Sequence, residues 1–241
     1  MSFVNKRRAL ITGASSGIGK ATALAFAKAG IDLALVSRSE SKLAAVARAA
    51  QETGVQAKAY PLDLALIEQV QTEIGKIAAD FGDIDILVNN AGMGYTSALP
   101  ETSLSDWLAV MNLNLTSVFQ CTLGVLPLMR DRQSGIIINV ASIAGQQAFP
   151  NWGAYCVSKA GLIALSKTLA VEERSHGIRV TAICPGAVNT ELWDTPTVHL
   201  NFDRSTMLTP ENVAQSILYI ALLPEQAAVE ELTIMPSAGV L

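Results

Sequence analysis

A regular alternation of short apolar runs and longer helix-like segments is the feature that most constrains the fold of this chain. Runs of strand length lie at residues 9–11, 32–37, 55–60, 84–88, 136–140, 178–183 and 232–235. Helix-like segments lie at residues 17–29, 64–81, 103–130, 155–175 and 210–223, and another starts at residue 39. Such alternation along a whole chain predicts a parallel sheet with helices on both faces. We therefore expect an α/β, doubly wound fold with a seven-stranded parallel sheet, formed by residues 1–241 as a single domain.

Two residues interrupt these patterns, and each of them helps to predict the local structure. The run at residues 136–140 is β-branched except at Asn139, which is typical of a strand that is buried on both faces. Pro127 stands near the end of the long helical segment 103–130 and predicts a kink there.

A glycine-rich turn links the first apolar run to the first helix-like segment. Gly13, Gly17 and Gly19 give it the spacing Gly-x-x-x-Gly-x-Gly. Glycines let the backbone approach a pyrophosphate closely, and a helix N-terminus supplies N–H groups and a favourable dipole. A plain tight turn is the alternative, but it would not need three glycines in seven residues. The turn therefore predicts a dinucleotide site in a Rossmann-type fold.

The end of the second apolar run indicates which dinucleotide is bound. An acidic residue there takes the ribose hydroxyls of NAD, whereas an arginine accommodates the extra phosphate of NADP. This run ends in Ser37 and Arg38, followed by Ser39, and the first acid is Glu40 in the next helix. An arginine between two hydroxyls suits a phosphate. We therefore expect NADP(H) rather than NAD, with an ordinary surface arginine as the alternative interpretation.

Tyr155 and Lys159 place a phenol and an amine four residues apart in a segment predicted to be helical. On a helix such residues share one face, with their Cβ atoms about 5–6 Å apart. A free tyrosine has a pKa of about 10, and a neighbouring cation lowers that pKa. We therefore expect Tyr155 to exchange a proton with an alcohol or ketone near neutral pH.

Composition argues against several other classes of protein. The chain has 17 basic and 21 acidic residues, a net charge of −4, which predicts neither a nucleic-acid partner nor a membrane surface. The scattered cysteines Cys121, Cys156 and Cys184 predict neither a disulfide framework nor a metal site. No run reaches ~18 uninterrupted apolar residues, so we expect no transmembrane helix and a cytoplasmic location.

Together these motifs resemble the short-chain dehydrogenase/reductase family, in its compact single-domain branch. The resemblance covers about residues 8–190. It is carried by the glycine turn, Asp63-Leu64, Asn89-Asn90-Ala91-Gly92, Asn114, Ser142, Tyr155 with Lys159, Pro185-Gly186 and Thr190. The Tyr-x-x-x-Lys spacing differs from that of the enoyl reductase branch, and the length and glycine spacing differ from those of the larger epimerase-like branch.

The resemblance implies a catalytic set of Asn114, Ser142, Tyr155 and Lys159. Ser142 and Tyr155 would hydrogen-bond the substrate oxygen, and Tyr155 would donate a proton while the carbonyl carbon receives a hydride. Lys159 would lower the pKa of Tyr155 and hold the nicotinamide ribose. Asn114 would anchor a water that links Lys159 to solvent. Each residue alone has an ordinary structural interpretation, such as a turn, a helix face or an interior aromatic.

The resemblance also implies contacts to the cofactor. Asp63 would accept from the adenine amino group beside the Leu64 backbone, Ile18 would pack near the nicotinamide, and Thr190 would bond the carboxamide or pyrophosphate. Asn90 is also a candidate for tying strands together through its amide. The full expected set is Gly13, Ser15, Ser16, Gly17, Ile18, Gly19, Ser37, Arg38, Asp63, Leu64, Asn90, Ala91, Gly92, Tyr155, Lys159, Pro185, Gly186, Val188 and Thr190.

Two departures from the family pattern shape the functional hypothesis. NADP-preferring relatives often carry a basic residue just before the second glycine, where this chain has Ser16, so the NADP prediction depends chiefly on Arg38. Residues 232–239 also lack the Asn-Gly-Gly ending of bacterial 3-oxoacyl-carrier-protein reductases. We therefore expect an NADPH-dependent carbonyl reductase or alcohol dehydrogenase. A 3-oxoacyl-carrier-protein reductase of fatty-acid synthesis and a non-catalytic dinucleotide-binding sensor are the alternatives.

Residues 187–209 form the one segment without a clear period and are the predicted substrate loop. Its apolar residues would suit a hydrophobic small-molecule carbonyl substrate, or they would only anchor the loop: Leu192, Trp193, Val198, Leu200, Phe202 and Met207. Arg204 is its only candidate partner for a substrate carboxylate. Residues 93–95 and 143–149 are further substrate candidates. The helices at 103–130 and 154–175 resemble the family's dimer-forming helices, which implies a homodimer or homotetramer.

Overall fold

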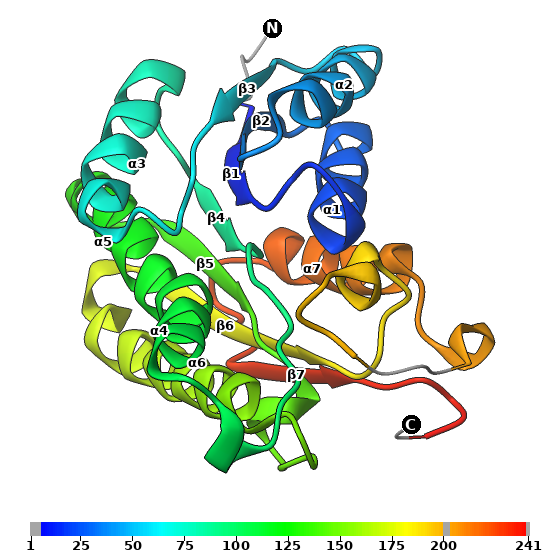
Figure 1. Cartoon of the computed structure of the whole chain (residues 1–241). Helices are drawn as coiled ribbons and strands as arrows, with labels where there is room; N and C mark the ends of the chain where they lie inside the picture. The colour runs from blue at the N-terminus through cyan, green and yellow to red at the C-terminus, as the bar shows by residue number, and fades with distance from the viewer. Residues whose placement is uncertain (1–5, 200–202, 240–241) are drawn as a thin grey trace, which may run out of the picture.

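The sheet contains seven parallel strands in the order β3-β2-β1-β4-β5-β6-β7 (Figure 1). The computed structural model describes residues 6–199 and 203–239, so Leu200 and Phe202 of the predicted substrate loop lie outside the described residues. The strands are β1 (Arg8–Thr12), β2 (Asp32–Ser37), β3 (Ala57–Pro61), β4 (Ile86–Asn89), β5 (Gly135–Val140), β6 (Ile178–Pro185) and β7 (Glu231–Ile234). The predicted doubly wound α/β fold with a seven-stranded parallel sheet is confirmed.

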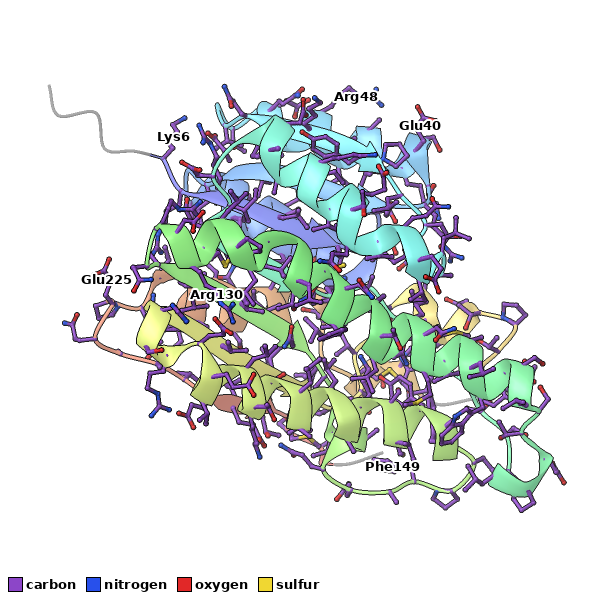
Figure 2. The ribbon with its side chains drawn as sticks, turned by 90° about the vertical axis from the view of Figure 1, so that its left-hand side faces the viewer. Lys6, Glu40, Arg48, Arg130, Phe149 and Glu225 are labelled. Atoms are coloured by element: carbon purple, nitrogen blue, oxygen red, sulfur yellow. The ribbon has the colours of Figure 1, made fainter. Side chains whose placement is uncertain are left out.

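Helices cover both faces of this sheet. They are α1 (Gly17–Lys28), α2 (Glu40–Gln51), α3 (Ile67–Phe81), α4 (Leu104–Met111), α5 (Ser117–Asp131), α6 (Gly153–Glu172) and α7 (Pro210–Leu222). One core joins α1, α2 and α7 to the sheet through side chains such as Phe26, Leu43 and Val213. The second core joins α3, α5 and α6 to the opposite face, which Figure 2 views with these helices in front.

The order of the strands creates a crevice at one edge of the sheet. β1 pairs with β2 on one side and with β4 on the other, so the helices that follow β1 and β4 depart to opposite faces. In open parallel sheets, ligands bind at such a switch point, beyond the carboxyl ends of the strands. The turns that follow β1 to β6 all open on this edge, and they carry the motifs singled out in the sequence.

Several element boundaries differ from those predicted, and the differences have local causes. α3 begins at Ile67 rather than at residue 64, because Asp63 Oδ1 accepts a hydrogen bond of 3.0 Å from the Ala65 N–H and holds a turn there. α6 begins two residues before Tyr155 and ends at Glu172, where a 3₁₀ turn takes over.

The helical segment predicted at 103–130 is not one regular helix. A π-helical turn, η2 (Asn112–Thr116), separates α4 from α5. Pro127 lies inside α5, which continues beyond it to Asp131. The π-helical turn, at the centre of the segment, is therefore where the regular α-helix is interrupted. π-Helical turns inside α-helices occur frequently at functional sites.

Asn139, the polar residue in the apolar run of β5, belongs to a buried hydrogen-bonded chain. The Asn89 amide donates to Asn139 Oδ1 at 2.9 Å, and the Asn139 amide donates to Ser166 Oγ at 2.8 Å. All three side chains have no more than 1 % of their surface exposed. The chain joins β4, β5 and α6 just below the edge that carries the crevice. These hydrogen bonds help to align the three elements, because the buried amides pair with these partners only in this arrangement. Asn89 Oδ1 is the exception and has no partner among the described residues.

Replacing Asn139 should therefore destabilise the fold through the partner that it leaves behind. Asn139→Leu keeps the side-chain shape but leaves the buried Asn89 amide with only its longer contact of 3.4 Å to Thr122 Oγ1, which should cost about 1–3 kcal/mol. The double variant Asn89→Leu/Asn139→Leu removes both groups and should cost less than the sum of the two single variants. Urea unfolding of the wild type and the three variants measures this coupling. Additive single-variant effects would contradict the assignment.

Candidate active site

A cavity of about 790 Å³ lies at the carboxyl ends of the strands. Of the residues predicted to bind the cofactor or to act in catalysis, all but Gly19 and Asn114 line it. Its predicted lining residues are Gly13, Ser15, Ser16, Gly17, Ile18, Ser37, Arg38, Asp63, Leu64, Asn90, Ala91, Gly92, Ser142, Tyr155, Lys159, Pro185, Gly186, Val188 and Thr190. Residues that follow six different strands therefore share a single cavity.

The glycine turn has a shape that other residues would disrupt. Gly13 adopts φ +65°, and a Cβ there would lie 2.7 Å from Asn90 Nδ2 and 2.9 Å from Ala91 Cα. A Cβ on Gly19 would collide with the carbonyl oxygen of Gly13. Gly19 therefore serves the close packing of α1 on this turn and does not line the cavity. The N-terminus of α1, with its N–H groups, faces the cavity through Ser16 and Gly17.

Hydrogen bonds tie the turn after β1 to the turn after β4. Thr12 Oγ1 accepts from the backbone N–H groups of Asn90 and Ala91, each at 3.0 Å. The Asn90 amide in turn donates to the carbonyl oxygens of Thr12 at 3.0 Å and Gly13 at 3.3 Å. Asn90 therefore lines the cavity and also has the strand-tying contacts that its sequence context suggested.

The end of the cavity beside β2 has unused hydrogen-bonding capacity. Ser37 Oγ is buried and has no hydrogen-bond partner among the described residues. Arg38 is exposed at the same rim, and no acidic side chain of residues 6–199 or 203–239 forms an ion pair with it. A buried hydroxyl without a partner costs free energy, which a polar ligand group would recover. A hydroxyl and a guanidinium side by side fit a phosphate-bearing ligand.

Ser142 and Tyr155 meet at the other end of the cavity. Both side chains line the cavity, and Ser142 Oγ accepts from the Ala144 N–H at 3.1 Å. Burial raises the pKa of Tyr155 to about 12, against a smaller opposing effect of the Ser142 hydroxyl. The expectation that Lys159 lowers the pKa of Tyr155 is therefore not what this structure shows.

The position of Lys159 explains that difference. Its Nζ donates to the Val140 carbonyl oxygen at 2.9 Å and lies 5.7 Å from the centre of the Tyr155 ring. Lys159 is itself buried, and burial lowers its pKa to about 8. Desolvation penalises the charged form of both side chains, and here it outweighs the attraction between a cation and a phenolate.

Asn114 lies behind the cavity wall, inside the π-helical turn. Its Oδ1 accepts from the Met93 N–H at 2.8 Å, and its Nδ2 donates to the Met93 carbonyl oxygen at 2.9 Å and to Ser158 Oγ at 3.1 Å. The side chain is fully buried. Asn114 thus holds the segment after β4 against α6, and its expected role in holding a water stays a prediction.

The substrate side is built from three segments that pair through their backbones. The Thr96 N–H donates to the Thr197 carbonyl oxygen at 2.9 Å, and the Ser97 N–H donates to the Asn151 carbonyl oxygen at 2.8 Å. The predicted substrate loop is also bridged at Val188 and Leu208. The loop after β4, the residues before α6 and the substrate loop therefore form one connected wall.

The apolar residues of the predicted loop divide into two groups. Leu192 and Trp193 line the cavity, whereas Val198 and Met207 are buried without lining it. Arg204 forms a two-point ion pair with Asp194, with distances of 2.6 and 3.1 Å, and does not line the cavity. It is therefore not the partner for a substrate carboxylate that its sequence position suggested.

Trp152 is among the lining residues that the sequence interpretation missed, and Glu191 lies in the predicted substrate loop but was not singled out there. The signal for Trp152 was its position three residues before Tyr155, which places it beside that residue at the start of α6. Glu191 follows Thr190 directly, at the start of a 3₁₀ turn. Among the described residues, no group of three or more His, Cys, Asp or Glu side chains is placed to hold a metal ion.

Two of the similar proteins carry the same name. The chain is 38 % identical over 250 residues to a 3-oxoacyl-[acyl-carrier-protein] reductase of Synechocystis sp., covering 100 % of this chain and 99 % of that protein. It is 36 % identical over 218 residues to a reductase of the same name from Thermotoga maritima, covering 88 % and 89 %.

Solved structures share the whole fold. An alcohol dehydrogenase from the archaeon Thermococcus sibiricus, complexed with 5-hydroxy-NADP, superposes with a TM-score of 0.88 at 31 % identity and 97 % coverage of each chain. The family model for short chain dehydrogenase matches residues 7–199, which include the glycine turn, Asn114, Ser142, Tyr155 and Lys159. The chain therefore belongs to the short-chain dehydrogenase/reductase family.

Proposed function

We propose that this protein is an oxidoreductase that transfers a hydride between NADPH and a carbonyl or secondary alcohol substrate. The observation that carries the proposal is the meeting of the glycine turn with Ser142, Tyr155 and Lys159 in one cavity. NADPH, when bound, supplies the hydride. A reduction then needs one group to hold the substrate oxygen and one to give it a proton, and the neighbouring hydroxyls of Ser142 and Tyr155 fit both needs.

The cavity offers a suitable group for each part of the dinucleotide. The N-terminus of α1 would face the pyrophosphate, and Ser37 with Arg38 would hold the ribose phosphate that distinguishes NADP from NAD. Asp63 would receive the adenine amino group, and Val188 with Thr190 would lie at the nicotinamide end. The buried, unpartnered hydroxyl of Ser37 supports this assignment, because a bound phosphate would satisfy it.

Burial gives Tyr155 and Lys159 definite proton states near neutral pH. With a pKa raised to about 12, Tyr155 keeps its proton and can donate it to the oxygen of a reduced carbonyl. Lys159, with a pKa of about 8, is still charged at neutral pH. Its cation beside the Tyr155 ring favours the phenolate that forms as the proton leaves.

Two alternatives remain next to the carbonyl reductase proposal. The names of two relatives favour a 3-oxoacyl-carrier-protein reductase, whereas the similar archaeal structure is named an alcohol dehydrogenase. A purely dinucleotide-binding protein would have no need for the pair of Ser142 and Tyr155. Rates with a carrier thioester and with free ketones distinguish a 3-oxoacyl-carrier-protein reductase from a carbonyl reductase. Failure to oxidise NADPH with any carbonyl would favour the dinucleotide-binding protein.

We also propose that the chain works in the cytoplasm as a single catalytic unit that assembles into a homodimer or homotetramer. Leu104, Leu108, Phe119, Val157 and Val171 are exposed on α4, α5 and α6. The helical stretches 104–131 and 153–172 are long and apolar enough to cross a membrane by length and composition alone, yet both pack on the sheet. A second copy of the chain would cover their outer faces, and light scattering would measure the assembly.

Tyr155→Phe should remove the proton donor and leave the cavity otherwise intact. We expect kcat to fall by about 10²–10⁴-fold, the usual contribution of a positioned acid or base. NADPH affinity, measured by fluorescence titration, should change little. Tyr219→Phe on α7, whose side chain is 60 % exposed, is the matched control and should keep full activity. Unchanged turnover in Tyr155→Phe would contradict the proposed mechanism.

Arg38→Ala should weaken NADPH binding far more than NADH binding. Loss of a charge-assisted contact to the ribose phosphate should raise the Kd for NADPH by about 10- to 100-fold. Arg48→Ala removes another exposed arginine from the neighbouring α2 and should leave both affinities unchanged. Equal effects of Arg38→Ala on the two cofactors would overturn the NADP assignment.

Reduction should slow as the pH rises above about 8. Lys159 loses its proton there, and the cation that favours proton loss from Tyr155 disappears, whereas Tyr155 stays protonated up to about 12. The kcat/KM for ketone reduction should therefore be level below pH 8 and decline above it. A rate that stays level to pH 10 would show that the charge of Lys159 is not needed.

A further inference from the structure

Two tryptophans form an aromatic corner next to Tyr155 at the substrate end of the cavity. The ring centres of Trp152 and Trp193 are 5.8 Å apart with an angle of 76° between the planes, and those of Trp152 and Tyr155 are 5.1 Å apart at 63°. The three rings therefore meet edge to face, as a corner rather than a stack. All three residues line the cavity, so the corner is part of its wall.

The backbone and side-chain contacts around this corner hold both indoles in place. Trp193 Nε1 donates to the Val188 carbonyl oxygen at 2.8 Å, which fixes its ring at the start of the substrate loop. Trp152 is bridged to Ser97 at the N-terminus of α6. Because the fold already holds both rings in place, an apolar group that packs against them costs little side-chain entropy at the site.

The charges around the corner argue against an anionic substrate. Of the described residues that line the cavity, Arg38 and Lys159 are the only cations. Arg38 is at the opposite end, and Lys159 is buried with its amine on the Val140 carbonyl oxygen. Arg204 is paired with Asp194, outside the lining. Glu191, the acidic residue of the loop that does line the cavity, has its carboxylate beside Gly17 in the glycine turn. The described residues at the corner therefore offer a substrate carboxylate or phosphate no cation to offset the loss of its hydration.

We propose that the carbonyl substrate is an uncharged ketone that carries an aromatic ring, with the ring against Trp152 and Trp193 and the carbonyl group at Tyr155 and Ser142. This proposal rests on the proposed function. The carbonyl carbon receives a hydride from NADPH and the oxygen receives the proton of Tyr155, so the C=O π bond becomes one C–H and one O–H bond. The products are a secondary alcohol and NADP⁺, and Tyr155 regains its proton from solvent.

Two matched pairs of substrates test the two halves of this proposal on the wild-type enzyme with NADPH. Acetophenone and cyclohexyl methyl ketone have similar size and differ in aromaticity, and methyl benzoylformate and benzoylformate differ in charge. We expect kcat/KM to favour acetophenone by about three- to tenfold, the range that ring–ring contacts support. The ester should be favoured over the acid by about tenfold or more, because no cation of the described lining is free at the corner to offset the desolvation of a carboxylate.

The outcomes separate failure of this proposal from failure of the proposed function. NADPH oxidation that favours the cyclohexyl ketone, the acid or the acetoacetyl thioester of N-acetylcysteamine over acetophenone overturns the aromatic-ketone proposal and leaves the hydride-transfer function standing. No NADPH oxidation with any member of the panel overturns both.

Substitutions in the corner provide an independent readout. Trp193→Leu and Trp152→Leu should each bring the ratio of kcat/KM for acetophenone and cyclohexyl methyl ketone close to one. Trp107→Leu is the matched control, since Trp107 lies on α4 and does not line the cavity. It should keep both the rate and the ratio. If Trp152→Leu does not fold, Trp193→Leu alone decides, and an undiminished aromatic preference in it overturns the proposal.

Discussion

The whole site depends on the close contact between the turn after β1 and the turn after β4. Asn90 donates two hydrogen bonds to Thr12 across it, and a side chain on Gly13 would collide with Asn90 and Ala91. This contact brings the N-terminus of α1 to the edge where β4, β5 and β6 also end. An anion-binding helix terminus and a proton-donating side chain can share one cavity only because that edge is common to both.

Burial sets the chemistry at the other end of the cavity. Tyr155 and Lys159 lie on one face of α6, as their spacing requires, but their proton affinities are decided by desolvation rather than by their attraction to each other. The π-helical turn adds a further buried group, because it lets Asn114 bond both polar atoms of the Met93 backbone. The segment between the glycine turn and the catalytic side chains is thus held by a fully paired amide, not by packing alone.

The substrate end of the cavity is built by long-range contacts, since its wall joins three segments that are far apart in the chain. Backbone hydrogen bonds connect the loop after β4, the residues before α6 and the substrate loop. Trp152 and Trp193 meet only because of these connections, and Arg204 is withdrawn from the cavity by its pairing with Asp194. An aromatic, nearly cation-free pocket results from contacts that no local pattern encodes.

The alternation of apolar runs and helical segments determined the sheet, its parallel strands and the two helical layers. Each strand or helix has its own pattern of apolar residues, which can be recognised within a short stretch of sequence. The spacing of the glycines, of Tyr155 and Lys159 and of the polar residues after each strand also placed about half of the cavity lining, since parallel strands must end at one edge. Only the tertiary structure decided the π-helical turn, the start of α3, the raised pKa of Tyr155 and the pairing of Trp152 with Trp193. These features depend on burial and on contacts between distant segments, and both arise only when the chain has folded.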